Sequence, residues 1–136
     1  MTMTDVLYRF GSVGLDVDRL HTWLAASYWA GQRSREQIER SLRHSFCISA
    51  WDGTTMVGFA RLITDFATHA YLCDVIVDPA AHGQGVGRGL VSRLVGHEAV
   101  ATCLIQLLTR DAHGVYRPLG FVDRPAMLKP RRRPDG

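Results

Sequence analysis

One stretch constrains the fold of this chain more than any other, because it joins an apolar run, a glycine-rich turn and an amphipathic segment without a break. Residues 75–90 read VIVDPAAHGQGVGRGL. Glycine lets the backbone approach a ligand closely, and the free N–H groups and dipole at the start of a helix favour an anion such as a pyrophosphate. The stretch therefore predicts a strand, a phosphate-binding loop and a helix in that order.

Two common phosphate-binding motifs do not fit this loop. The dinucleotide motif needs a third glycine five positions after the first, but that position is Arg88 when counted from Gly83 and Leu90 when counted from Gly85. The P-loop needs a lysine directly after its last glycine, and the only lysine is Lys129. A glycine-rich turn without a ligand remains the plain alternative, although clustered glycines cost conformational entropy.

Hydrophobic spacing predicts further elements on both sides of the loop. Strands are expected at about 6–10, 46–51, 56–63, 70–77 and 104–108, and helices at about 17–28, from 34, 86–97 and 111–119. Ser34, followed three residues later by Gln37, predicts a capping box at the start of the second helix, and Gly120 predicts the end of the last one. Asp52-Gly53 predicts a hairpin, whereas the helix between the strands at 70–77 and 104–108 implies parallel pairing of those two strands. The sequence thus predicts an α/β (α+β) fold with a mixed sheet.

Length and charge predict one domain with a distinct end. The chain of 136 residues fits one domain, because a second core would need about 50 residues or more of its own. The net charge of +3 comes from residues 129–136, because residues 1–128 carry equal numbers of acidic and basic groups. We therefore expect a neutral domain over 1–128, a flexible basic tail over 129–136, and no nucleic-acid partner.

Composition also bears on location and metal binding. No stretch approaches the roughly 18 apolar residues of a membrane span, and the first residues lack the pattern of a secretory signal. We therefore expect no membrane partner and a cytoplasmic location. Cys47, Cys73 and Cys103 lie singly in apolar stretches, which predicts reduced core residues with neither a disulfide framework nor a metal site.

With these residues in view, the chain resembles the Gcn5-related N-acetyltransferase (GNAT) family. The coenzyme A signature of that family has Arg or Gln, two residues, Gly, one residue, then Gly or Ala, and here residues 82–87 read HGQGVG. Downstream, Tyr116 stands four residues before Gly120-Phe121, like the tyrosine of the family's closing segment. The resemblance extends to about Phe121. It implies a mixed, mostly antiparallel central sheet flanked by helices, and acetyl-CoA as cosubstrate.

The resemblance also implies which residues bind the cosubstrate. They are Val75, Ile76, Val77, His82, Gly83, Gln84, Gly85, Val86, Gly87, Arg88 and Asp111. His82 stands where the family has Arg or Gln, and Asp111 stands where many members have an asparagine. Backbone N–H groups of the loop carry most of the implied pyrophosphate contact.

Acetyl transfer from a thioester to an amine needs a deprotonated amine and a proton for the departing thiolate. Tyr116 is the candidate proton donor, because a phenol with a pKa of about 10 is protonated at neutral pH; a purely interior tyrosine is the alternative. Asp74 is the candidate base. Simple alternation predicts that Asp74 shares a face with Leu72 and Ile76, where partial burial raises its pKa. A structural salt bridge at Asp74 with a relayed water as base is the alternative.

Tyr28 and Trp29 are candidates for the acceptor site, with core packing as the alternative. We expect direct transfer in a ternary complex, because no cysteine has a neighbour that marks an activated nucleophile. The acceptor would be an amine of a small molecule or a peptide. A non-catalytic domain that binds acetyl-CoA as a sensor or interaction module is the alternative function. Homodimers are common in the family, although nothing in the sequence selects an interface.

Overall fold

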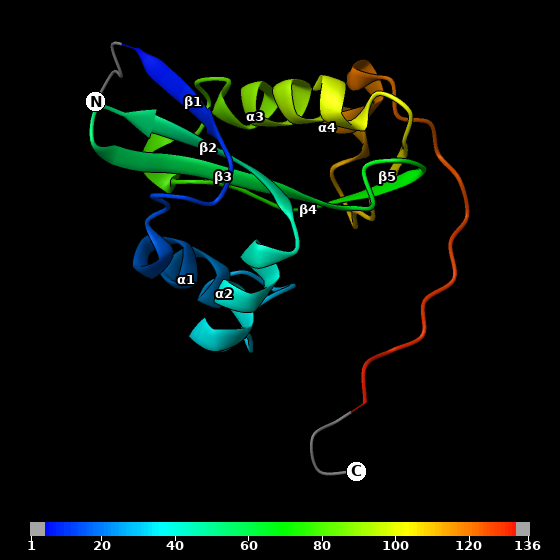
Figure 1. Ribbon diagram of the computed structural model, residues 1–136, viewed down its shortest axis with the longest axis horizontal. Coiled ribbons are helices and arrows are strands. Elements are labelled where there is room, and N and C mark those ends of the chain that lie inside the picture. The colour runs from blue at the N-terminus through cyan, green and yellow to red at the C-terminus, as the bar shows by residue number, and fades with distance from the viewer. Residues whose placement is uncertain (1–4, 133–136) are drawn as a thin grey trace.

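A five-stranded mixed sheet organises the protein (Figure 1). The structure is a computed structural model and describes residues 5–132. The strands, in their order across the sheet, are β1 (Val6–Phe10), β2 (Phe46–Asp52), β3 (Thr55–Thr64), β4 (His69–Val77) and β5 (Leu104–Gln106). Neighbours are antiparallel except β4 and β5, which are parallel. The predicted fold class is confirmed.

Helices cover both faces of this sheet (Figure 1). They are α1 (Val17–Ala25), α2 (Arg35–Arg43), α3 (Val86–Val95) and α4 (His113–Tyr116), with short 3₁₀ turns at Pro79–Ala81, Glu98–Val100 and Arg117–Leu119. On one face, α1 and α2 pack on a core that includes Leu20, Ile38 and Phe59. On the other face, α3 packs on a core that includes Leu62 and Leu90. Strand β3 therefore contributes residues to two separate cores.

The two helices on the first face begin where the sequence predicts. Ser34 accepts a hydrogen bond from the Gln37 backbone at 3.1 Å, and the Gln37 side chain accepts one from the Ser34 backbone at 2.9 Å, so the predicted capping box is confirmed. Helix α1 is shorter than predicted, because it ends at Ala25 and leaves Tyr28 outside the helix with an exposed fraction of 62%. Tyr28 therefore lies in the connection between α1 and α2.

Two predicted elements near the end of the domain are shorter in the structure. Strand β5 ends at Gln106 rather than at residue 108, because its pairing with β4 ends there. The helix predicted over 111–119 is a single turn, α4, followed by a 3₁₀ turn. Pro118 has no N–H to donate, which breaks the helical ladder, and Gly120 closes the turn with a φ of 97° as predicted.

After Phe121 the chain follows an extended path with neither helix nor strand up to Arg132, where the described part ends (Figure 1). The predicted flexible tail falls partly on residues 133–136, which lie outside the described residues. Within residues 5–132, no helix has the length and apolar character needed to cross a membrane.

Helix α3 approaches β3 closely at Gly58, and this contact positions the loop of residues 82–87 that precedes α3, called the glycine loop below. A Cβ atom at Gly58 would meet the Leu90 side chain at 2.9 Å and the Val86 side chain at 3.0 Å. Both distances are shorter than van der Waals contact, so a side chain at this position pushes α3 away from the sheet. Gly58 thus sets the height of α3 above the sheet.

We expect Gly58→Ala to destabilise the protein by about 1–3 kcal/mol through overpacking, measured as the free energy of unfolding in urea. Gly114→Ala is the matched control, because a Cβ atom at Gly114 meets nothing within 4 Å. This substitution should change the free energy of unfolding by less than about 0.5 kcal/mol. Equal stability of the two variants would show that α3 is not held by this contact.

Candidate functional site

The edge of β4 that faces β5 is open along the second half of the strand. The two strands pair only at three positions, and the last pair is Tyr71 with Gln106. Beyond that pair, the structure gives residues 72–77 of β4 no strand partner on this side. The predicted cosubstrate residues Val75, Ile76 and Val77 lie on this open edge. Their backbone N–H and C=O groups on that side are therefore available to an extended amide-containing ligand.

The glycine loop continues directly from this open edge. Gly83 and Gly85 both have a φ of 79°, a left-handed conformation that favours glycine, and a Cβ atom at either position would point into open space. Within residues 5–132, no hydrogen bond uses the backbone N–H groups from Gly85 to Arg88 at the start of α3. Free donors, the positive end of a helix dipole and open space fit the diphosphate of coenzyme A.

The predicted contacts within this loop differ in kind. The Val86 side chain is buried in the core beneath α3, so only its backbone N–H faces the loop. Arg88 is exposed on the first turn of α3. The His82 ring bonds back to the Val77 carbonyl, with 3.0 Å between Nε2 and the oxygen, so Nε2 is the protonated nitrogen of that ring and is already engaged. The free backbone N–H groups from Gly85 to Arg88 are thus the donors that this loop offers to a ligand.

A β-bulge interrupts β4 at Asp74. Phe59 of β3 faces Ile76 and Arg61 faces Cys73, so the single residue between them on β3 faces two residues on β4. Asp74 takes up the extra residue with a φ of 54°, which aspartate tolerates better than most residues do. Leu72 packs in the core under α3 whereas Ile76 packs against the core under α1 and α2. The expectation that both share a face with Asp74 is therefore wrong.

The Asp74 carboxylate is buried and accepts hydrogen bonds from three side chains. The donors are Arg61 Nε at 2.7 Å, Arg33 Nη1 at 2.6 Å and Trp29 Nε1 at 3.0 Å. Burial acts to raise the pKa of Asp74, but the charges and hydrogen bonds of Arg61 and Arg33 outweigh it and hold the pKa below its ordinary value. The expected rise in the pKa of Asp74 is therefore wrong, because that expectation considered burial alone and not the charges of Arg61 and Arg33.

Tyr116 lies on α4, half buried against the core under α3. Its ring makes an edge contact with Phe121 at 5.9 Å between centroids. Burial, followed by the nearby Tyr28, raises the pKa of the Tyr116 hydroxyl above its ordinary value. Among the described residues no group bonds to this hydroxyl, and it is not a buried unsatisfied atom, so it remains open to solvent and to a ligand.

The connection between α1 and α2 brings Tyr28 and Trp29 to the same region. Trp29 bonds to Asp74, its ring meets Tyr28 edge to face at 5.2 Å, and the Arg110 guanidinium stacks 3.9 Å from the centre of the Tyr28 ring. Arg110 follows β5, so this stack joins the α1–α2 connection to the segment after β5. Tyr28 and Trp29 are exposed by 62% and 40%, which fits a wall of a site better than a core.

The remaining predicted residues behave more simply. Asp111 is exposed in the loop before α4. The three cysteines are free thiols, and burial raises the pKa of Cys47 to about 12 and that of Cys73 to about 11, which opposes formation of a thiolate nucleophile. In the described part of the chain, no cluster of three or more His, Cys, Asp or Glu residues could hold a metal ion.

Sequence reasoning missed Arg33, Arg61 and Arg110. Arg61 had a usable signal, because it is the one charged residue in the predicted strand over 56–63, as Asp74 is in the strand over 70–77. Two isolated opposite charges on adjacent antiparallel strands are expected to pair. Arg33 and Arg110 lie in connections, where no periodic pattern indicates which way a side chain points.

Comparison with known sequences shows which family the chain belongs to. Residues 15–121 match the Acetyltransferase (GNAT) family. GCN5-related N-acetyltransferase 1, chloroplastic, of Arabidopsis thaliana is 34% identical over 128 residues, which cover 90% of this chain and 64% of that protein. Serotonin N-acetyltransferase 2, chloroplastic, of Oryza sativa subsp. japonica is 32% identical over 129 residues, with coverages of 89% and 64%. The chain thus spans just under two thirds of the length of these relatives.

Solved structures of acetyltransferases have the same fold as this chain. A crystal structure of a gnat family protein from Xanthomonas campestris pv. campestris superposes with a TM-score of 0.87 at 32% identity, covering 98% of this chain and 96% of that one. A structure with acetyl-CoA from Clostridium acetobutylicum shares the fold, with a TM-score of 0.70 at 17% identity and coverages of 93% and 96%. The chain therefore belongs to the acetyltransferase (GNAT) family, as its glycine loop and its Tyr116 segment indicate.

Proposed function

We propose that this protein is an acetyl-CoA-dependent N-acetyltransferase that transfers the acetyl group directly to a primary amine within a ternary complex. The observation that carries the proposal is the set of free N–H groups from Gly85 to Arg88 beside the open edge of β4. The relatives from Arabidopsis thaliana and Oryza sativa are named N-acetyltransferases, which supports acetyl transfer to an amine. The cytoplasmic location and the possibility of a homodimer stay predictions.

Acetyl-CoA supplies the thioester when bound. The loop that contains Gly83 and Gly85 would hold its diphosphate, and the backbone of Val75, Ile76 and Val77 would bond to its amides along the open strand edge. The bulge at Asp74 interrupts the β3–β4 ladder beside that edge. Unpaired backbone N–H groups at such a bulge are suitable donors to an oxygen that gains negative charge.

Tyr116 is the proton donor in this proposal. Its raised pKa keeps the phenol protonated at neutral pH, and its hydroxyl has no competing partner among residues 5–132. The proton passes from the Tyr116 hydroxyl to the departing thiolate, and solvent restores it.

Asp74 fits a positioning role better than the role of base. Its two carboxylate oxygens already accept three hydrogen bonds, its side chain is only 2% exposed, and its pKa is lowered, so it binds a proton weakly. We propose that Asp74 holds Trp29 and Arg33 at the acceptor site while a water molecule takes the proton of the amine.

The cosubstrate loop can be tested with two glycines in the same conformation. Gly85→Ala and Gly53→Ala both place a side chain at positive φ in open space, so each should lower stability by about 1–2 kcal/mol. We expect only Gly85→Ala to weaken acetyl-CoA binding, by about tenfold or more in calorimetry, because Gly53 lies in the β2–β3 turn. Unchanged affinity in Gly85→Ala, or no acetyl-CoA binding by the unmodified protein, would refute the proposed site.

Tyr116→Phe tests the proton donor. We expect kcat to fall by about 100-fold or more while acetyl-CoA affinity stays within about twofold, because the hydroxyl acts on the departing thiolate rather than on binding. Tyr8→Phe is the control, since Tyr8 lies on β1 beside Arg93 of α3. Turnover by Tyr116→Phe within twofold of the unmodified protein would remove Tyr116 from catalysis. Thiol release by neither protein with any amine, despite binding, would favour the sensor function.

Asp74→Asn separates a positioning role from a base. Because the pKa of Asp74 is lower in the folded protein than its unfolded value of about 3.9, its contribution to stability is present at neutral pH and disappears as the pH falls below about 4. We expect the variant to lose about 3–5 kcal/mol of unfolding free energy at pH 7, with a smaller difference from the unmodified protein in acid. We also expect the acidic limb of kcat/KM to survive in the variant.

Loss of that limb in Asp74→Asn would restore Asp74 as the base. If the variant does not fold, the unmodified protein still decides the point, because an acidic limb centred between about pH 6 and 8 lies far above any pKa of Asp74.

A further inference from the structure

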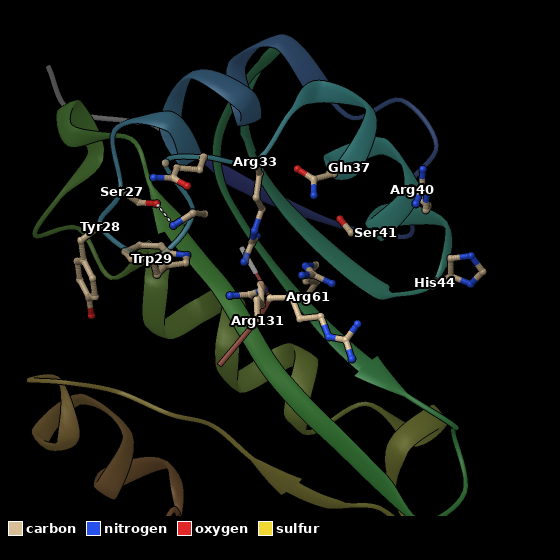
Figure 2. Close-up of a pocket in the computed structure, with 14 residues that line it drawn as sticks. Ser27, Tyr28, Trp29, Arg33, Gln37, Arg40, Ser41, His44, Arg61 and Arg131 are labelled. Carbon is tan, nitrogen blue, oxygen red and sulfur yellow. Dashed lines mark hydrogen bonds between the residues drawn. The ribbon is translucent and has the colours of Figure 1, made fainter. Parts of the chain in front are cut away.

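A basic cleft lies on the face of the sheet that α1 and α2 cover. Its volume is about 960 Å³, and its walls come from the α1–α2 connection, α2, β3 and the C-terminal segment (Figure 2). Five arginines and one histidine line it: Arg33, Arg40, Arg61, Arg131, Arg132 and His44. Of the described residues that line it, none is acidic. These six residues come from four separate parts of the chain, so no local sequence pattern shows them together.

The positive charge of the cleft is only partly neutralised. Ion pairs among the described residues reach three of the five arginines, through two carboxylates. Asp74 is shared by Arg33 and Arg61, and Glu36 contacts Arg40 at 3.3 Å along the exposed side of α2. Positive charge therefore exceeds negative charge around the cleft, and an anion that enters meets several guanidinium groups.

The cleft adjoins the proposed reaction site. Tyr28 and Trp29 line it, and Trp29 donates its indole N–H to Asp74 at the bulge of β4. Figure 2 shows the side chains of Arg33 and Arg61 directed toward one another with Arg131 beside them, while Arg40 and His44 lie toward the other end. A ligand seated among the arginines thus has Tyr28 and Trp29 along one end of the cleft.

We propose that this cleft binds an anionic group of the acceptor, a carboxylate or a phosphate, so that the acceptor is a small amine that also carries negative charge. This inference rests on the proposed function and specifies its substrate class. Guanidinium groups bind carboxylate and phosphate oxygens with paired, charge-assisted hydrogen bonds. The same field repels polyamines and lysine-rich peptides, whose extra cationic groups would lie among the arginines.

Matched acceptor pairs test the inference. One pair is phenylalanine and phenethylamine, which tests a carboxylate, and the other is O-phosphoethanolamine and ethanolamine, which tests a phosphate. For each pair we measure kcat/KM for the compound that carries the anionic group and divide it by kcat/KM for the compound that lacks it, in the unmodified protein and in variants. Comparing a ratio between proteins removes the effect of the different amine pKa values. The pair with the larger change identifies the anionic group.

We expect Arg40→Gln and the double variant Arg131→Gln/Arg132→Gln to lower this ratio by about tenfold or more for at least one pair, the loss of one or two charge-assisted hydrogen bonds. These arginines are suitable because none of them contacts Asp74. Arg43→Gln is the matched control, since Arg43 is an exposed arginine of α2 that does not line the cleft. Its ratio should stay within about twofold of that of the unmodified protein.

Binding gives a second measurement that does not need turnover. With coenzyme A saturating the glycine loop, inorganic phosphate should raise the Tm of the unmodified protein and of Arg43→Gln, but raise it less in Arg40→Gln. Ratios that are unchanged in Arg40→Gln, or an equal effect of phosphate on all three proteins, would overturn the inference. Acetylation of phenethylamine and ethanolamine alone would also overturn it while leaving the proposed function intact.

Discussion

The buried carboxylate of Asp74 ties the two halves of the site together. It sits on β4, and its three donors come from β3 and from the α1–α2 connection, so one side chain fixes a surface loop onto the sheet. A buried ion pair seldom stabilises a fold more than apolar packing does, because both charges lose their hydration. Its effect here is geometric: Trp29 and Arg33 are held over the point where β4 departs from regular pairing.

The bulge at the same residue explains why the site opens on two faces. One extra residue on β4 reverses the alternation of the strand, so Leu72 and Ile76 serve different cores, and Val75 packs toward α3. The open edge of β4 and the glycine loop then lie beside α3, whereas the basic cleft lies beside α1 and α2. In the proposed reaction, the cosubstrate and the acceptor would therefore approach the bulge from opposite sides, an arrangement that suits direct transfer without a covalent enzyme intermediate.

Features that depend on neighbouring residues were predictable from the sequence, and features that depend on strand register were not. The capping box at Ser34, the left-handed glycines of the loop and the stop at Gly120 follow from local backbone chemistry. The bulge at Asp74 depends on how β4 aligns with β3, and the end of β5 depends on where it diverges from β4. The lowered pKa of Asp74 was missed for the same reason, because its partners lie 13 and 41 positions away.

The positive charge of the cleft was not predictable from the sequence either. Residues 1–128 sum to zero charge, yet folding gathers arginines from positions 33, 40, 61 and 131 around one cleft. Fields from exposed charges are screened over about 8 Å at physiological salt, so local grouping matters more to a bound anion than the total does. The arginines near the C-terminus thus add to the positive charge of the cleft, because the extended segment after Phe121 places Arg131 and Arg132 at its wall.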